Sequence, residues 1–393
     1  MWSSYRSSYD EMLYRAISMH SMAYHPGIAA HTLAIRLVGS GGRLTFLQFS
    51  NSLTRAAPCQ QTRTTTSVKQ WTLTVPLSQL PYALVDVFAE RPLEGNMLAI
   101  FTDARGLTSD QMQALARETN LAETTFILPA DDPAAELTEG VRVRIFTTQE
   151  ELDFAGHPTL GTASWLYWNH PTLRGAETIS LNLNAGKIPV RFQPAQQGKP
   201  GVYGTMRQID PIFTTVHDPA IIAPTLGLAV EDFDSRYPIQ TVSTGMPFCI
   251  VPVRTMEALS RLEIPQAAAQ AYLAQHGAKF FYCLTPLPQG SDADFHARMQ
   301  FYNGEDPATG SASGCAISWL VQHGIVPSGQ QVVIEQGIEI RRPSRLYVRA
   351  TKEVTAYRDV TANEIYPKQQ PGIFDVFVSG RTIPVASGHF FLT

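Results

Sequence analysis

The 393-residue sequence predicts an α+β fold made of two similar lobes. Three observations lead to this prediction. A strand, a glycine-rich turn and an apolar helix follow one another twice along the chain, each half combines many short strands with one long helix, and the length suffices for two cores. We therefore expect two curled sheets, each packed against a helix, with a cleft that both lobes share.

The repeat consists of residues 154–163 and 305–314, each after a strand-like run. One shift of 154 residues (310 − 156 = 154) places Gly156 on Gly310 and residues 164–166 on 318–320, which both read Ser-Trp-Leu. A weaker echo aligns Gly95 with Gly245 at a shift of 150 (245 − 95 = 150). The identities are few, so chance similarity is the competing interpretation. A duplicated unit is the interpretation that fixes the fold.

Composition excludes several classes of function. A formal net charge of -4 and the lack of a basic stripe argue against a nucleic-acid partner. The four cysteines form no CxxC pair and have no histidine at metal-ligand spacing, which argues against a disulfide framework and a zinc site. No apolar run approaches the ~20 residues of a membrane span. We expect a cytoplasmic protein without a membrane partner.

The first 80 residues differ from the rest. Between Glu11 and Asp86 there is no acidic residue, and arginine and serine are frequent. Transit peptides share this composition, but the length of the stretch and its Asp10 favour disorder, a wrongly assigned start or a species-specific extension. We assign residues 1–80 to a non-core extension, 81–215 to an N-terminal lobe and 216–393 to a C-terminal lobe, whose last strand is compatible with a return to the first lobe.

The pattern of each lobe is similar. In the first, strands are expected at 83–88, 98–101, 121–128, 141–146, 179–183, 188–192 and 202–206, and a helix at 107–120 that starts with a Thr108/Gln111 capping box and ends at Asn120. In the second, strands are expected at 239–242, 248–253, 279–285, 332–335, 346–349 and 374–378, and a helix at 265–276. Two apolar helices follow the glycine turns at Gly156 and Gly310.

Five ordered motifs between residues 82 and 393 resemble the phenazine-biosynthesis isomerase (PhzF-like) family. They are Val85-Asp86-Val87-Phe88 with Leu93-Glu94-Gly95-Asn96, then Asn120-Leu121-Ala122-Glu123-Thr124-Thr125-Phe126, Phe154-Ala155-Gly156-His157-Pro158, Glu305-Asp306-Pro307-Ala308-Thr309-Gly310-Ser311-Ala312, and Arg342-Pro343-Ser344. The chain departs from the family pattern at three positions, where Met97, Asp153 and Arg341 replace Pro, Pro and Gly.

The resemblance implies the fold of diaminopimelate epimerase, in which two pseudo-symmetric lobes, each a β-barrel-like sheet around a central helix, enclose the active site. It also implies an isomerase that needs no cofactor, acts on C–H bonds next to a carboxylate and assembles as a homodimer. The family's acid/base glutamate falls on Glu123, and the resemblance brings His157 and Asp306 to the same pocket. Epimerases of this fold use two cysteines, but Ala155 and Thr309 stand at those positions, so a two-thiol racemase is not expected.

Each candidate residue has a plainer interpretation. Glu123 is either an acid/base or a solvated residue at the end of a helix. His157 either orients substrate or packs at a helix start. Asp306 either faces the pocket or caps a helix.

Backbone N–H groups of the glycine turns are expected to bind the carboxylate of a small-molecule substrate. The residues concerned are Gly156, Thr309, Gly310 and Ser311, with Gly95 and Asn96 as further ligand contacts. The alternative is that these glycines serve only tight turns.

The preferred function is an isomerase that moves a proton and a double bond in a small carboxylate, with Glu123 as the single acid/base, in secondary metabolism. The alternatives are an epimerase with non-thiol bases, a non-catalytic carboxylate-binding protein and, least favoured, a metal hydrolase that uses His157, Asp306 and Glu123. Solvent-deuterium exchange, product formation and sensitivity to chelators distinguish them.

Overall fold

The computed structural model describes strands at residues 31–34, 43–53 and 64–74 together with residues 78–301, 304–353 and 372–392. The chain divides into two compact units, of which Gln79–Phe390 is the larger. In the smaller unit, β1 (His31–Ala34), β2 (Arg43–Leu53) and β3 (Thr64–Thr74) form an antiparallel sheet. The sequence analysis assigned no element to this stretch, and most of the remaining predicted extension lies outside the described residues.

Eight strands of the larger unit close into a barrel. In order around it they are β4 (Ser78–Val87), β5 (Asn96–Phe101), β6 (Glu123–Leu128), β7 (Val141–Thr147), β9 (Thr178–Leu183), β10 (Gly186–Phe192), β11 (Val202–Arg207) and β21 (Ile373–Leu392), which pairs with β11 and returns to β4. The buried helix α4 (Gly156–Asn169) packs against β5, β6, β9, β10 and β11 and is therefore the central helix. Helices α2 (Ser109–Thr119) and α3 (Ala135–Glu139) and strand β8 (Glu151–Leu152) complete this lobe.

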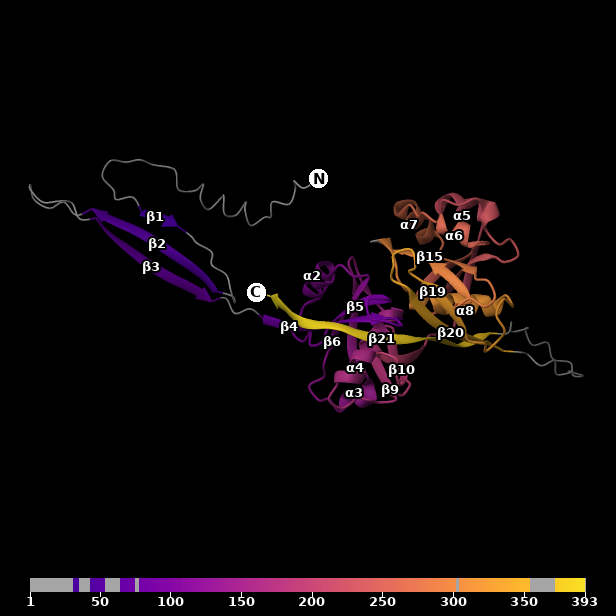
Figure 1. Cartoon of the computed structure of the whole chain (residues 1–393), viewed down its shortest axis with the longest axis horizontal. Helices are drawn as coiled ribbons and strands as arrows, with labels where there is room; N and C mark the ends of the chain where they lie inside the picture. The colour runs from indigo at the N-terminus through magenta and orange to yellow at the C-terminus, as the bar shows by residue number, and fades with distance from the viewer. Residues whose placement is uncertain are drawn as a thin grey trace, which may run out of the picture. The chain divides into compact units, whose positions relative to one another are not determined.

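The second lobe is a curled sheet that shares β21 with the first (Figure 1). From β21 its order is β20 (Ser344–Lys352), β19 (Val332–Gln336), β16 (Phe295–Arg298), β15 (Phe280–Pro286), β14 (Pro247–Pro252), β13 (Ile239–Ser243) and β12 (Ile212–His217). Helix α8 (Gly310–Gln322), with all but its last residue buried, packs against β13, β14 and β20. The remaining elements are α5 (Pro219–Thr225), η1 (Val230–Asp232), α6 (Met256–Ser260), α7 (Gln266–Gln275), β17 (Gln300–Phe301) and β18 (Gly304–Glu305).

The ladders of the two lobes repeat the same pattern. From β4 to β10 the pairs are antiparallel, parallel, antiparallel, parallel and antiparallel. From β13 to β20 they have the same sequence of orientations. The predicted α+β fold of two pseudo-symmetric lobes, each a curled sheet around a central helix, is therefore confirmed.

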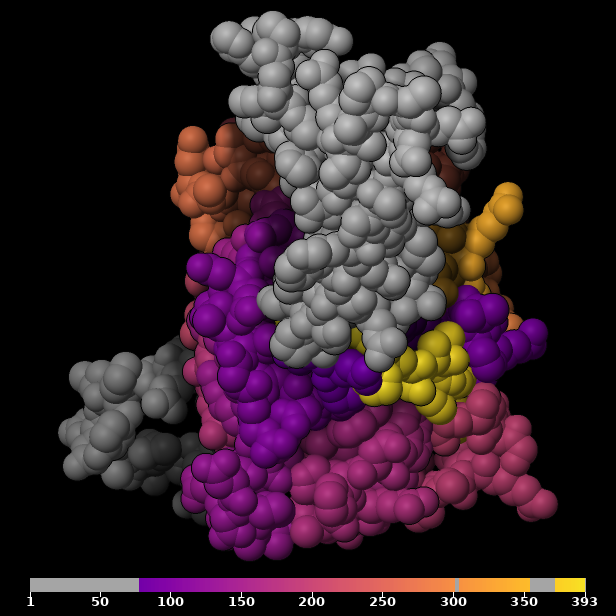
Figure 2. All heavy atoms as spheres, turned by 90° about the vertical axis from the view of Figure 1, so that its left-hand side faces the viewer, coloured from indigo at the N-terminus to yellow at the C-terminus, as the bar shows by residue number. Residues whose placement is uncertain are grey.

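The long strand β21 joins the lobes. Its Ile373–Ser379 part pairs with β20, whereas Phe377–Thr382 pairs with β11. Figure 2 shows its yellow end lying beside the indigo atoms of β4, with which it also pairs. The sequence analysis predicted only residues 374–378 as strand, which is too short. The residues from Pro384 onward are mostly exposed, so their hydrophobic pattern does not announce a strand.

Most other elements lie where they were expected, including the capping box of α2 and its left-handed C-cap Asn120. The strand β12 and the short helices α3, α5 and α6 were not predicted. The expected lobe boundary at residues 215–216 lies inside β12, which pairs with β13. Within the described residues, none of the helices is both long enough and apolar enough to cross a bilayer.

Candidate active site

Glu123 is the first residue of β6 and follows the C-cap of α2 by three residues. Its backbone lies in the ladder opposite Thr147, and the residue is only 8% exposed. Burial, and secondly the negative charge of Asp306, raise the pKa of the Glu123 carboxyl well above its usual range. The interpretation of Glu123 as a solvated residue at the end of a helix is therefore wrong for this structure.

His157 is the second residue of α4 and is buried. Its Nδ1 lies 3.3 Å from the side-chain amide nitrogen of Asn96, which can only donate, so the ring hydrogen belongs on Nε2. Nε2 lies 3.6 Å from Glu123 Oε2 and has no hydrogen-bond partner within the described residues. Burial lowers the pKa of His157 to about 3. The imidazole is therefore a neutral donor that faces the carboxyl of Glu123.

Asp306 precedes α8 and is also buried. Asn96 Nδ2 donates to Asp306 Oδ1 over 2.8 Å, and Thr309 Oγ1 donates to Oδ2 over 2.6 Å. Burial raises the pKa of Asp306 against the opposing effect of these two hydrogen bonds. The N-cap residue of α8 is Thr309. Asp306 therefore binds side chains of the site, and simple helix capping does not describe its role.

The N-termini of α4 and α8 meet at two glycines. A Cβ on Gly156 would lie 2.6 Å from the Ser311 nitrogen, and one on Gly310 would lie 3.4 Å from Gly156 Cα. The first N–H groups of each helix have no acceptor within their own helix, so both helices direct donors and positive dipole ends toward one place. Thr309 differs, because its N–H donates to Gln336 Oε1 over 3.1 Å.

A pocket of about 390 Å³, including the solvent at its opening, lies at this junction. Glu123, His157, Asp306 and the turn residues Gly156, Thr309, Gly310 and Ser311 all line it. Asn96 is linked to the site through its side-chain amide nitrogen, which contacts His157 Nδ1, Asp306 Oδ1 and the Ala308 carbonyl. Eight of the nine predicted site residues therefore come together.

Gly95 is the exception. Its N–H donates to the carbonyl of Pro343 over 3.0 Å, so it is not directed toward the pocket. The glycine is needed for another reason: its φ is +71°, and a Cβ would lie 2.3 Å from the Val87 carbonyl oxygen. The plain-turn interpretation fits Gly95, whereas Asn96 belongs to the site.

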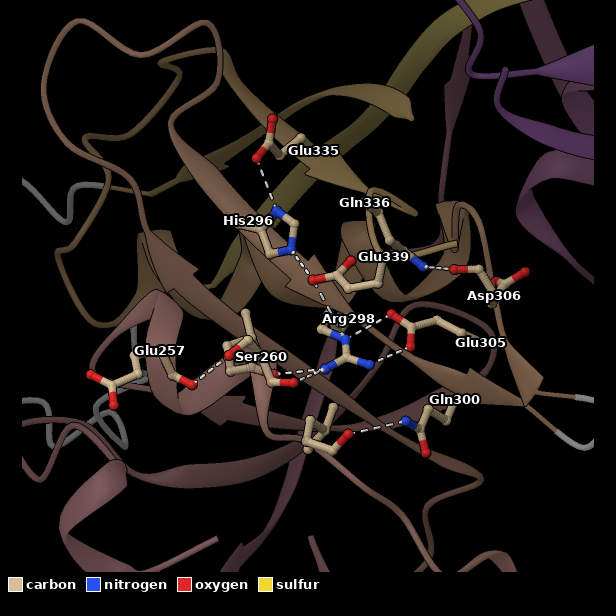
Figure 3. A network of polar contacts seen from close by, with 12 residues as sticks. Glu257, Ser260, His296, Arg298, Gln300, Glu305, Asp306, Glu335, Gln336 and Glu339 are labelled. Carbon is tan, nitrogen blue, oxygen red and sulfur yellow. Dashed lines mark hydrogen bonds and ion pairs between the residues drawn. The ribbon is translucent and has the colours of Figure 1, made fainter. Parts of the chain in front are cut away.

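The sequence analysis missed side chains that hold the site in place. Gln336 Nε2 donates to the Asp306 carbonyl over 2.8 Å (Figure 3) and to Thr309 Oγ1 over 2.9 Å. Arg342 donates to the carbonyls of Glu94 and Gly95 and pairs with the buried Asp86 over 2.6 Å. Arg342 was part of a recognised motif, but nothing near Gln336 in the sequence signals its partners, which lie 27 and 30 residues away.

Of the residues that depart from the family pattern, neither Met97 nor Asp153 lines this pocket, whereas Met97 lines a second pocket together with Asn96 and Asp306. Arg341 has a φ of +58°, a left-handed conformation that glycine adopts without strain. This explains why glycine suits the position before Arg342-Pro343-Ser344. Among the described residues, no three His, Cys, Asp or Glu side chains are grouped so that they could hold a metal ion.

Fold and site together define an α+β protein of the epimerase-like fold with buried ionisable side chains at the junction of two related lobes. Residues 85–363 match the PhzC-PhzF family, described as phenazine biosynthesis-like protein. The chain belongs to this family, and the resemblance inferred from the motifs is confirmed.

Two similar proteins that are named as isomerases support the same family assignment. The chain is 37% identical over 279 residues to the trans-2,3-dihydro-3-hydroxyanthranilate isomerase of Pseudomonas aeruginosa, which covers 68% of this chain and 90% of the relative. It is 35% identical over 274 residues to the isomerase of the same name from Pseudomonas chlororaphis, with the same coverage. The chain is an isomerase, as the sequence analysis predicted.

Solved structures agree with the fold. A PhzF-family protein from Bacillus anthracis has a TM-score of 0.66 at 25% identity and covers 80% of this chain and 100% of its own. A predicted epimerase from Pseudomonas aeruginosa has a TM-score of 0.64 at 34% identity with the same coverage. A hydroxyproline epimerase from Agrobacterium vitis, at 12% identity and a TM-score of 0.50, shares the fold across 80% of this chain and 93% of its own.

Proposed function

We propose that the chain shifts a proton and a double bond within a small cyclic carboxylate, with Glu123 as the single acid/base. The relatives' names supply the substrate class: a dihydroaromatic amino carboxylate of the trans-2,3-dihydro-3-hydroxyanthranilate type. The geometry of the pocket supports the proposed mechanism. The observation that carries the proposal is that two duplicated halves present opposite chemistry to the same pocket.

Each polar group of the site has an apolar or weakly polar counterpart in the other lobe. The shift of 154 residues relates Leu152 to Asp306 and His157 to Ser311 (306 − 152 = 154; 311 − 157 = 154). Leu152 and Asp306 both line the pocket. The shift of 150 residues relates Asn96 to Met246, which also lines it (246 − 96 = 150).

Glu123 has its counterpart through the ladders. Ala99 pairs with Thr124, and Cys249, 150 residues after Ala99, pairs with Phe281 (249 − 99 = 150). The residue that corresponds to Glu123 is therefore Phe280, which lines the pocket as well. The lining also contains a hydrocarbon wall, which we define as the side chains of Leu152, Met246, Phe248, Phe280 and Met299, beside the charged Glu150 and Lys279.

A one-sided arrangement favours proton transfer on one face of the substrate. The Glu123 carboxylate removes a proton from one ring carbon, and the electron pair of that C–H bond forms a new double bond. The electrons of the former double bond then take the proton from Glu123 at a second carbon, so that no atom is gained or lost. A raised pKa makes the carboxylate a stronger base and lets it hold the proton until delivery.

Other groups bind the substrate. The N–H groups at the starts of α4 and α8 suit its carboxylate. The Nε2–H of His157, which has no hydrogen-bond partner among the residues that the structure describes, suits an oxygen of the ring substituent. The hydrocarbon wall suits the face of an unsaturated ring. Asp306, whose raised pKa has the same main cause as that of Glu123, is available to share the proton.

The test measures turnover of trans-2,3-dihydro-3-hydroxyanthranilate by NMR with Glu123→Gln, using Glu118→Gln as the matched control on the exposed surface of α2. Glu123→Gln should retain ligand binding and lose about 10²–10⁴-fold in kcat, while Glu118→Gln should behave as the wild type. Near-normal turnover in Glu123→Gln would rule the mechanism out.

An epimerase with two non-thiol bases is the second candidate. It requires a base on each face of the substrate, and the counterpart of Glu123 is Phe280. In D₂O, single-base transfer allows part of the substrate hydrogen to be retained in the product, whereas epimerisation between two bases imports deuterium at each turnover. Full deuterium incorporation at low conversion would favour the epimerase.

Four expectations accompany the proposal and remain predictions. Turnover should persist after dialysis against a chelator without added cofactor. Sedimentation should give a homodimer. Loss of the gene should affect a secondary-metabolite pathway of the phenazine kind, as the names of the relatives suggest, with the protein found in the cytoplasm.

A further inference from the structure

Each lobe contains an arginine that holds a glutamate seven residues later. Arg144 Nε and Nη2 donate to the two carboxylate oxygens of Glu151 over 2.7 and 2.5 Å. Arg298 binds Glu305 with the same atoms and the same two distances. The shift of 154 residues relates the two pairs (298 − 144 = 154; 305 − 151 = 154), so this ion pair was duplicated with the fold.

The two copies differ in burial and in the residue after the glutamate. The Arg144 and Glu151 side chains are 19% and 26% exposed, whereas those of Arg298 and Glu305 are both 7% exposed. Leu152 comes after Glu151, while Asp306 comes after Glu305. Only the second copy therefore places a buried charge pair directly beside an acid of the candidate site.

Arg298 and its neighbour fix the backbone around Asp306. Figure 3 shows the Arg298 guanidinium between Glu305 and the end of α6, where Nη1 donates to the carbonyls of residues 259 and 260 over 2.8 and 3.1 Å. The backbone N–H of Asp306 donates to the Met299 carbonyl over 2.8 Å. The backbone carbonyl of Asp306 accepts a hydrogen bond from Gln336 Nε2. The Asp306 peptide groups are therefore held from both sides.

A second layer of charges supports this pair. His296 lies between Glu335 and Glu339, with 2.9 Å from Nδ1 and from Nε2 to the respective carboxylates (Figure 3). Glu339 Oε1 is 3.6 Å from Arg298 Nε, and Arg345 binds the other oxygen of Glu335 over 2.7 Å. With His296 protonated, three cations meet the three carboxylates of Glu305, Glu335 and Glu339.

The charge of Glu305 acts on Asp306 because the two residues are adjacent. Burial is the main cause of the raised pKa of Asp306, and Glu305 adds to it. The other titratable or charged side chains around Asp306 are Glu123, His157, Tyr282 and Arg342, with Glu150 and Lys279 on the more exposed part of the pocket lining. Without Arg298, Glu305 would be a buried carboxylate without its main counter-charge.

We propose that Arg298 and Glu305 are positioning residues that fix Asp306 against the substrate and keep the charge beside it compensated. This inference rests on the proposed function, in which Asp306 faces the substrate. The corresponding pair of the first lobe, Arg144 and Glu151, contributes to stability only, because the residue after Glu151 is the uncharged Leu152.

The experiment compares Arg298→Met, the double variant Arg298→Met/Glu305→Gln and the matched control Arg144→Met. The first readout is the ¹³C-carboxyl titration of Asp306 by NMR, assigned with Asp306→Asn, and it requires no turnover. The second is the pH dependence of kcat/KM with trans-2,3-dihydro-3-hydroxyanthranilate. Thermal unfolding reports on the stability of each variant.

Arg298→Met should move the Asp306 titration to higher pH and lower kcat/KM by about tenfold or more. The double variant should return the titration toward lower pH, because the uncompensated charge is gone. Arg144→Met should lose stability without moving the titration. If Arg298→Met does not fold, Glu305→Gln alone should move the titration below that of the wild type.

An Asp306 titration that stays unshifted in Arg298→Met, or in Glu305→Gln where that variant is the one measured, contradicts the inference. So does a shift of equal size in Arg144→Met. Failure of the proposed function looks different: Glu123→Gln would then retain near-normal turnover, whatever the titration of Asp306 in the other variants.

Discussion

The contact between the two central helices predicts a strong effect of one methyl group. In Gly156→Ala the new Cβ would lie 2.6 Å from the Ser311 nitrogen and 2.8 Å from the Gly310 carbonyl carbon. Ordinary contacts of a Cβ begin near 3.4 Å, so the helix starts must separate by about 0.8 Å. These neighbours are backbone atoms and cannot rotate away.

The size of the effect depends on competing terms. Overpacking of this kind costs ~1–3 kcal/mol, which exceeds the ~0.5–1 kcal/mol that alanine gains over glycine in a helix. We expect Tm to fall by ~2–5 °C. Activity should suffer more, because the displacement moves His157 and the N–H groups of α8 relative to each other, and a shift near 1 Å can cost ~10²-fold.

The assay combines thermal unfolding with kcat/KM, and Gly372→Ala is the control because a Cβ there meets nothing within 4 Å. The control should match the wild type in both measurements. If Gly156→Ala also matches the wild type, the helices do not meet as described and the reasoning about a shared anion site is refuted.

Three further predictions concern titratable groups. The pKa of Glu123 is raised in the folded state, so the stability contributed by its protonated carboxyl is lost as pH rises above the unfolded value near 4.5. Measured by urea unfolding, Glu123→Gln should therefore become more stable relative to the wild type as pH increases. Burial alone would lower the pKa of His296, but its carboxylate partners raise it to about 9. Against an unfolded value near 6.5, this adds ~3 kcal/mol of stability below pH 6.5 that is lost as pH rises through 9; His296→Gln should lack this loss, and equal pH slopes would contradict it. The thiols of Cys249, Cys283 and Cys315 are buried, and their pKa values are raised. Iodoacetamide should therefore leave the activity of the folded enzyme unchanged. Rapid inactivation that tracks modification of any of these three cysteines would refute that expectation.

Much of the fold could be predicted from the sequence because the sequence contains a recognisable internal repeat. A shift of 154 residues aligned two strand–turn–helix units, and the ladders repeat in the same order. The length of β21 could not be predicted, because its second part is mostly exposed and its partner strands β4, β11 and β20 come from distant parts of the sequence. Local patterns report on a strand's faces and say nothing of its distant partners.

The candidate site divides in the same way. The sequence by itself determined which residues are the candidates for the chemistry: Glu123, His157, Asp306 and the glycine turns stand in ordered motifs. Only the tertiary structure decided their protonation and their surroundings, because pKa values depend on burial and on neighbours that lie far apart in the chain. The same holds for the hydrocarbon wall around Phe280 and for the hold of Arg298 on Glu305, since the role of each side chain is fixed by the groups that the fold brings opposite it.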